Sequence, residues 1–238
     1  MNKPMQRLLS ELNGMRGGAL GANQLVEIMQ EITTAHDCLS EIGAAVSFFG
    51  SARIPRDDPD YDIARRSARL LSSEGFAVIS GGGPGIMEAV NQGAQEGGSA
   101  SIGLNIRLPG RNETPNPYQD INLSFQHFFV RKMIFVHFAT AFVVMPGGVG
   151  TLDEVLECLT LMQTDKVHRI PVILVNGSFW GGLVDWFRGT LLERGTIAEG
   201  DLDMFRILDR PEEIRDAVNG FYRGGQGGFD PLETSRVR

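Results

Sequence analysis

Residues 141–154 read AFVVMPGGVGTLDE, an apolar run followed by a glycine-rich turn and the start of a segment with helical character. Glycine lets the backbone bend sharply and come close to an anion, and the next helix offers free N–H groups and a positive dipole end. The stretch therefore predicts a strand, a phosphate-binding loop and a helix. Glu154 is expected in the first turn of that helix, close to whatever the phosphate anchors, so the pattern favours chemistry on a nucleotide.

A second strand–glycine–helix unit lies upstream, in FAVISGGGPGIMEAVN at residues 76–91. Its glycines are Gly81, Gly82, Gly83 and Gly85. The unit lacks the G-x-G-x-x-G spacing of a dinucleotide fold and the Gly-Lys-Ser/Thr of a P-loop, so by itself it fits a binding loop and a tight structural turn equally well. Two such loops in one domain favour a nucleotide site.

Segments with strand character alternate with amphipathic helical segments along most of the chain. The expected strands are residues 44–49, 76–80, 101–105, 121–125, 141–145, 171–175 and 204–208. This alternation predicts one Rossmann-like α/β domain, with a doubly wound, mostly parallel sheet and helices on both faces. Ligands of such sheets bind beyond the carboxyl ends of the strands, where both glycine loops fall.

Three regions are expected along the chain. Residues 1–40 form an N-terminal extension with one helix, residues 41–223 form the nucleotide-binding domain, and residues 224–238 form a flexible, polar tail. Residues 107–119 are rich in Pro, Asn and Gly and predict a long loop. Long loops in compact domains are often functional.

Composition narrows the class of protein. Of 238 residues, 42% are hydrophobic and 21% charged, which is ordinary for a globular domain. The net charge of −7 argues against a nucleic-acid partner, because such binding depends on neutralising phosphates. Two cysteines make neither a disulfide scaffold nor a zinc site, and the four histidines lack metal-ligand spacing. With no signal peptide and no apolar run of about 18 residues, we expect a cytoplasmic protein that spans no membrane.

Arg131 and Lys132 form a basic pair within FFVRKMIF, residues 128–135. A solvated helix face is the ordinary explanation of such a pair. Here apolar residues flank it on both sides, and a long cation amid so much burial usually has an anionic partner, so we expect a role in the site. The helix over residues 128–138 also has more apolar positions than one sheet face can cover, which predicts a homo-oligomer interface.

Three motifs together resemble the LONELY GUY (LOG) family of cytokinin-activating phosphoribohydrolases: GGGPGIM at 81–87, RKM at 131–133 and PGGVGTLDE at 146–154. The resemblance covers residues 45 to 220, and PNPY at 115–118 with the N-terminal helix is similar to a longer subgroup. The family has carried the label lysine decarboxylase. The sequence speaks against that label, because none of its lysines sits in a recognisable pyridoxal-phosphate setting: Lys3, Lys132 and Lys166.

The resemblance implies hydrolysis of the N-glycosidic bond of a nucleoside 5′-monophosphate, AMP or N6-prenylated AMP, without metal or cofactor. Departure of the base leaves an oxocarbenium-like ribose. A nearby carboxylate either stabilises this positive charge or deprotonates the attacking water. Glu154 fits this role, and Arg131 fixes the phosphate or ribose hydroxyls and holds Glu154 ionised. Substrate binding is expected from both glycine loops and the residues beside them: Gly81, Gly82, Gly83, Gly85, Lys132, Gly147, Gly148, Val149, Gly150 and Thr151.

Four further positions follow from the resemblance less directly. Thr160 stands where the family has a substrate-contacting threonine, and Glu113 matches a carboxylate near the base in one alignment of the long loop. Ser51 either adds a phosphate donor or simply ends a strand. Glu88 replaces a glycine of the shorter members, and either marks the subgroup or alters the choice of base.

Two other hypotheses stay open. The same fold serves non-catalytic nucleotide sensors and molybdenum-cofactor carriers, and a structural subunit with a vestigial site is the third. Such binding proteins tend to lose the Arg–Glu pair, so Arg131 and Glu154 favour the enzyme. The resemblance also implies a homodimer as the unit, with a higher homo-oligomer in the longer subgroup. The sequence does not decide between AMP and prenylated AMP.

Overall fold

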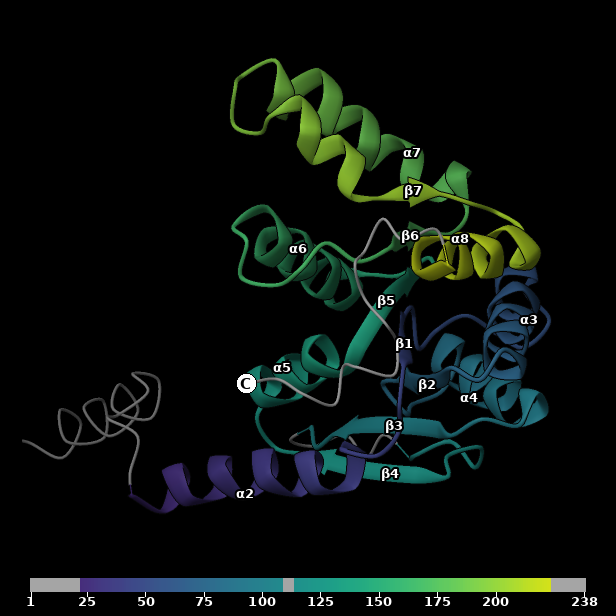
Figure 1. Cartoon of the computed structure of the whole chain (residues 1–238), viewed down its shortest axis with the longest axis vertical. Helices are drawn as coiled ribbons and strands as arrows, with labels where there is room; N and C mark the ends of the chain where they lie inside the picture. The colour runs from purple at the N-terminus through teal and green to yellow at the C-terminus, as the bar shows by residue number, and fades with distance from the viewer. Residues whose placement is uncertain (1–21, 109–113, 224–238) are drawn as a thin grey trace, which may run out of the picture.

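A computed structural model describes residues 22–108 and 114–223 of the chain (Figure 1). The predicted tail at 224–238 and the candidate Glu113 lie outside the described residues, as does most of the N-terminal extension. The part of the extension that is described is a helix, α2, as expected.

Seven strands form one sheet in the order β4-β3-β2-β1-β5-β6-β7, and each neighbouring pair is parallel. The central strands are buried on both faces and rich in β-branched and aromatic residues, as a parallel sheet covered by helices requires. The prediction of a mostly parallel sheet is therefore confirmed. The strands are β1 (Ala45–Phe49), β2 (Ala77–Ser80), β3 (Ser101–Ile106), β4 (Ile121–Phe125), β5 (Ala139–Val144), β6 (Val172–Leu174) and β7 (Arg206–Ile207).

Helices cover both faces of the sheet, so the predicted doubly wound, Rossmann-like architecture is confirmed (Figure 1). One hydrophobic core lies between the sheet and α3, α4 and α8, and the other between the sheet and α2, α5, α6 and α7. The helices are α2 (Ala22–Leu39), α3 (Pro59–Ser73), α4 (Ile86–Gly97), α5 (Phe128–Phe138), α6 (Val149–Gln163), α7 (Gly177–Trp186) and α8 (Pro211–Arg223), with a π-helical segment at Phe187–Leu192 and a 3-10 segment at Glu199–Met204.

The C-terminal third differs from the prediction in detail. The helix expected over residues 180–193 changes to π-helical geometry at Phe187–Leu192. The strand expected at 204–208 keeps only two residues, because its neighbour β6 is itself short and pairs only Ile173 and Leu174 with it. Local sequence does not show how much partner strand is available, so this boundary depends on tertiary pairing.

Strand β1 lies at the topological switch point of the sheet. Strands β2, β3 and β4 follow on one side of β1, and β5, β6 and β7 on the other. The chain leaves β1 toward α3 on one face and leaves β5 toward α6 on the opposite face. Doubly wound sheets bind their ligands at this point, beyond the carboxyl ends of the strands.

Candidate active site

Backbone hydrogen bonds tie together the three loops that follow β1, β2 and β5. The Ser51 N–H donates to the Pro146 carbonyl at 3.1 Å, and the Ser51 carbonyl accepts the Ile86 N–H at 3.0 Å. The Ser51 hydroxyl oxygen accepts the Arg53 N–H at 3.1 Å, which leaves its own O–H able to donate. Ser51 thus joins both glycine loops, and its candidate role as a phosphate donor stays a prediction.

The second glycine loop delivers an exposed helix N-terminus. Helix α6 begins at Val149 with Gly148 as its N-cap and no side-chain capping bond. Gly148, Val149 and Gly150 are exposed, and Val149 is 84% exposed. Thr151 is buried against Gly147, where an added Cβ would overlap the threonine side chain. The first turn of a helix leaves backbone N–H groups without intrahelical partners, so this end is suited to an anion.

Glu154 lies one turn further along α6 than expected. Because the helix starts at Val149, Glu154 is its sixth residue and belongs to the second turn, which corrects the prediction. Burial raises the pKa of the Glu154 carboxyl to about 7, and the nearby Arg131 and Lys132 lower it only in part. Arg131 favours the ionised carboxyl, as expected, but desolvation outweighs the guanidinium, so Glu154 is only partly ionised near neutral pH.

Arg131 is a buried cation on α5 that faces the same region. Its Nε donates to the Leu104 carbonyl at 2.7 Å, its guanidinium carbon lies 5.3 Å from the centre of the Phe135 ring, and its Nη2 packs against Gly81. A Cβ on Gly81 would overlap that Nη2 atom. The Arg131 charge lowers the pKa of Glu154, so the guanidinium is within electrostatic range of that carboxyl, and the catalytic roles of the two side chains stay a prediction.

Lys132, the neighbour of Arg131, turns to the flank of α6. Its Nζ lies 3.0 Å from the Asp153 carboxylate and 3.1 Å from the Glu157 carboxylate. Burial lowers the pKa of Lys132, but the hydrogen bonds to these two carboxylates outweigh it and the net shift is upward. The side chain is thus a charged link between α5 and α6, and its contact with substrate stays a prediction.

The first glycine loop is shaped by close approach on both sides. Gly82 and Gly85 have φ angles of 75° and 67°, which favour glycine. A Cβ on Gly85 would lie 2.5 Å from the Ser51 carbonyl oxygen, and one on Gly82 would overlap the Asn105 amide. The structure therefore shows a tight, sterically required turn whose Gly81 packs against Arg131, and a role of this loop in binding substrate stays a prediction.

Of the less direct candidates, Thr160 lies away from the glycine loops and Glu88 lies beside the first one. Thr160 is exposed in the second half of α6, and its hydroxyl donates to the Leu156 carbonyl at 2.7 Å, so the structure does not bring it to the glycine loops. Glu88 is buried in the first turn of α4, beside the first glycine loop as expected, and pairs with Arg56 from the loop after β1. This partner had no signal in the sequence.

Two amide side chains that contact the first glycine loop, one of them buried, were not expected from the sequence. Asn116 and Gln119 come from the long loop and both donate to the Gly82 carbonyl. The PNPY motif marks Asn116 in the sequence, but its partners lie more than thirty positions earlier and only the fold reveals them.

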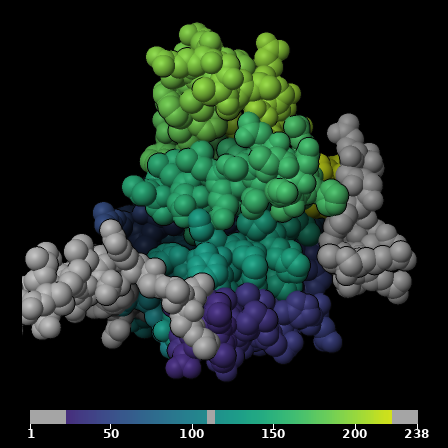
Figure 2. All heavy atoms as spheres, turned by 90° about the vertical axis from the view of Figure 1, so that its left-hand side faces the viewer, coloured from purple at the N-terminus to yellow at the C-terminus, as the bar shows by residue number. Residues whose placement is uncertain are grey.

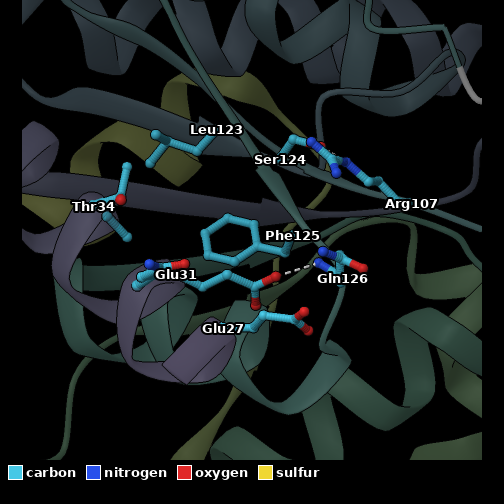
Figure 3. A pocket seen from close by; sticks show the side chains of 10 residues that line it. Glu27, Glu31, Thr34, Arg107, Leu123, Ser124, Phe125 and Gln126 are labelled. Carbon is cyan, nitrogen blue, oxygen red and sulfur yellow. Dashed lines mark hydrogen bonds between the residues drawn. The ribbon is translucent and has the colours of Figure 1, made fainter. Parts of the chain in front are cut away.

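The cavity in Figure 3 is separate from the glycine loops. It lies between α2 and the edge strand β4, has a volume of about 210 Å³ and is lined by Glu27, Glu31 and Arg107 among others. Glu31 is already engaged: its carboxylate accepts the Gln126 N–H at 2.6 Å and lies 3.1 Å from the His127 ring nitrogen. These contacts of Glu31 with Gln126 and His127 therefore fix α2 to the start of α5, the helix that carries Arg131.

Two other kinds of feature are absent from the part of the chain that the structure describes. No group of three or more His, Cys, Asp or Glu side chains there is arranged to hold a metal ion. No helix among residues 22–108 and 114–223 has the length and hydropathy needed to cross a membrane.

Comparisons with known proteins give the following similarities. Residues 87–218, more than half of the chain, match a family described as "Possible lysine decarboxylase". The chain is 36% identical over 161 residues to cytokinin riboside 5′-monophosphate phosphoribohydrolase LOG of Oryza sativa subsp. japonica, covering 66% of this chain and 64% of the relative. It is 27% identical over 161 residues to the cytokinin riboside 5′-monophosphate phosphoribohydrolase of Mycobacterium tuberculosis, and this match covers 66% of this chain and 82% of the relative.

Among solved structures, the molybdenum cofactor binding protein from the phototrophic bacterium Rippkaea orientalis superposes with a TM-score of 0.54. It is 24% identical and the match covers 75% of this chain and 97% of that one. A likeness at this level of identity shows the shared fold alone.

Proposed function

Because the chain belongs to the family described as "Possible lysine decarboxylase", which includes the cytokinin riboside 5′-monophosphate phosphoribohydrolases, we propose that it hydrolyses the N-glycosidic bond of a nucleoside 5′-monophosphate, AMP or N6-prenylated AMP. The products are the free base and ribose 5-phosphate. One observation carries the proposal: Glu154, a carboxyl with a pKa of about 7, lies one turn from an exposed helix N-terminus and within electrostatic range of the buried Arg131 guanidinium.

In the proposed reaction the phosphate binds the backbone N–H groups at Gly148–Thr151, where the dipole of α6 favours negative charge. The C1′–N bond breaks and a C1′–O bond to water forms. Glu154 takes the proton from the water, and the departing base takes up a proton from solvent. We expect Arg131 to bind ribose or phosphate oxygens, and its charge keeps part of the Glu154 population ionised.

The raised pKa of Glu154 suits this role. A general base works best when its pKa lies near the working pH, because it is then both available and strong enough to accept a proton. At a pKa of about 7, roughly half of the Glu154 carboxyls are ionised at neutral pH. We therefore expect turnover to rise with pH through this value.

The family's descriptive label implies pyridoxal phosphate, and the described lysines do not fit it. Schiff-base chemistry needs a neutral amine. Lys132 is held charged by Asp153 and Glu157, and Lys166 is exposed just after α6. Lys3 lies outside the described residues. We derive no decarboxylase step.

A carrier of molybdenum cofactor is the second candidate function, supported by the shared fold alone. A carrier needs a binding surface but no carboxyl tuned to accept a proton. The pKa of Glu154, beside Arg131, favours the hydrolase.

We also propose that the unit is a homodimer. Large apolar side chains are exposed on α2, α5 and α6, which lie on the same side of the molecule (Figure 2). They are Leu25, Val26 and Met29 on α2, Phe128, Phe129 and Met133 on α5, and Val149 and Leu156 on α6. Helix α5 carries both the exposed phenylalanines and Arg131, so a second copy on this surface would lie close to the site.

The direct test is release of base and sugar phosphate from AMP, GMP, CMP and isopentenyl-AMP. We expect equal amounts of adenine and ribose 5-phosphate from AMP or its prenylated form, and a large loss of turnover in Glu154→Ala. A wild-type protein that releases neither product, but binds molybdenum cofactor, would support the carrier instead. Full turnover by Glu154→Ala would refute the catalytic assignment.

A further inference from the structure

We propose that Asn116 is a positioning residue, which holds the first glycine loop at the place where Gly81 seats the Arg131 guanidinium. This inference rests on the proposed function, and its evidence is the hydrogen bonding and packing around Asn116. Asn116 belongs to the loop between β3 and β4 and is itself only 8% exposed.

Asn116 grips two consecutive peptide carbonyls of the glycine loop. Its backbone N–H donates to the Gly82 carbonyl at 2.9 Å. Its Nδ2 lies 3.0 Å from the Gly82 oxygen and 3.0 Å from the Gly83 oxygen. Gln119 adds a further donor to the Gly82 carbonyl at 2.7 Å. Three donors on one carbonyl fix the orientation of that peptide plane.

The orientation of the Asn116 amide is determined by its surroundings. Its Nδ2 also lies 2.9 Å from the Asn91 Oδ1 atom, and its Oδ1 accepts the Tyr118 N–H at 3.1 Å. Turning the amide over would place its oxygen against three other oxygens. Asn91 is fixed in turn, because its Nδ2 donates to the Ser101 hydroxyl and the Ile102 carbonyl. We call the contacts of Asn116 and Gln119 with Gly82 and Gly83 the clamp. The clamp has one arrangement, and Asn91 connects it to β3.

The clamp reaches the candidate catalytic pair through one residue. Gly81 precedes the gripped peptide, and its Cα faces the Arg131 Nη2 atom so closely that a Cβ would overlap it. Arg131 is held from the other side by the Leu104 carbonyl. If the glycine loop moves, the surface against which the guanidinium packs moves with it, and the distance between Arg131 and Glu154 changes.

A change in the distance between Arg131 and Glu154 alters the pH dependence of turnover. A loss of stability alone would leave that pH dependence unchanged. Among the described residues, the charged groups that act on Glu154 are Arg131 and Lys132 from α5 and Asp153 and Glu157 from α6. Of these, Arg131 is the one seated on the glycine loop. Moving it away removes a positive charge from beside the carboxyl and raises the pKa of Glu154.

The experiment measures kcat/KM against pH for the wild type, Asn116→Ala, Gln119→Ala and the control Asn122→Ala. Asn122 is exposed on β4 and contacts Asn105 but no residue of the glycine loop among the described contacts. We expect the acidic limb to move up by about 0.5 pH units or more in Asn116→Ala. Gln119→Ala should move it less in the same direction, and Asn122→Ala should match the wild type.

A second readout does not depend on activity. In protein labelled with 13C at the glutamate carboxyl carbon, the Glu154 signal, assigned by its loss in Glu154→Gln, should titrate at higher pH in Asn116→Ala than in the wild type. Folded Asn116→Ala and Gln119→Ala proteins with a wild-type Glu154 titration would overturn the inference. If Asn116→Ala does not fold, Gln119→Ala decides. A wild type that releases no base would refute the proposed function, while the carboxyl titration still tests the clamp.

Discussion

Replacing Glu154 with glutamine is expected to stabilise the protein above neutral pH while removing its activity. Burial raises the pKa of this carboxyl from 4.5 to about 7, and Arg131 offsets only part of the effect. A carboxyl with a higher pKa in the folded protein binds its proton more tightly there than in the unfolded chain. Raising the pH from 4.5 to about 7 therefore favours unfolding. The penalty is absent below this window and complete above it.

The size of the penalty follows from the shift. The difference between 4.5 and about 7 corresponds to about 3 kcal/mol when each pKa unit is 1.36 kcal/mol. Glu154 is mostly buried but keeps some exposure to solvent, which can relieve part of the cost, so about 1–2 kcal/mol is the expected measured value. Glutamine has nearly the same shape and no charge, so it escapes the penalty. Typical domains have a free energy of unfolding of about 5–15 kcal/mol, which makes this change measurable.

Urea unfolding at about pH 5 and about pH 8 tests this prediction. Glu154→Gln should gain about 1–2 kcal/mol over the wild type between the two conditions. Glu157→Gln makes the same chemical change one turn along α6, where the carboxylate pairs with Lys132, and its pH trend should follow that of the wild type. If the wild type and Glu154→Gln lose stability in parallel as the pH rises, the reasoning about desolvation is refuted.

Three further substitutions test the packing. Gly81→Ala places a Cβ against Arg131 Nη2 and should lower kcat by about 100-fold, since a shift of about 1 Å in a catalytic group has that effect. Steady-state kinetics, with circular dichroism to check folding, would measure this loss, and a wild-type kcat would contradict it. In Gly150→Ala the added Cβ meets no atom within 4 Å, so the free energy of unfolding should rise by up to about 1 kcal/mol. The same methyl group should crowd the phosphate and raise the KM for AMP. An unchanged KM would argue against a phosphate at this helix end. Phe129→Asp should halve the mass seen by light scattering from twice 26.0 kDa, and a wild type that is already monomeric would remove the dimer from the account.

The local parts of the site could be predicted from the sequence. The exposed start of α6 depends on the glycine run at 147–150 and the apolar strand before it, which lie next to each other in the chain. The apolar residues around Arg131 in the sequence predicted a buried cation, and Arg131 is buried. Strand alternation was enough for the doubly wound sheet.

Features that depend on distant contacts could not be predicted. Asn116 acts on Gly82 and Gly83, and Glu88 pairs with Arg56; neither partner has a fixed spacing in sequence. The position of Glu154 in the second turn depends on where α6 begins, and helix boundaries are the least certain part of any pattern. Its pKa could not be read from the sequence, because it is set by the balance between burial and the Arg131 charge in three dimensions.

The most direct measurement is a crystal structure of Glu154→Gln soaked with AMP, in which turnover is blocked and the nucleotide stays whole. We expect the phosphate to accept hydrogen bonds from the N–H groups of Gly148–Thr151, and the ribose C1′ to face the side chain at position 154, with Arg131 on the sugar or phosphate. A nucleotide bound in the cavity of Figure 3, or with its C1′ turned away from residue 154, would contradict the account.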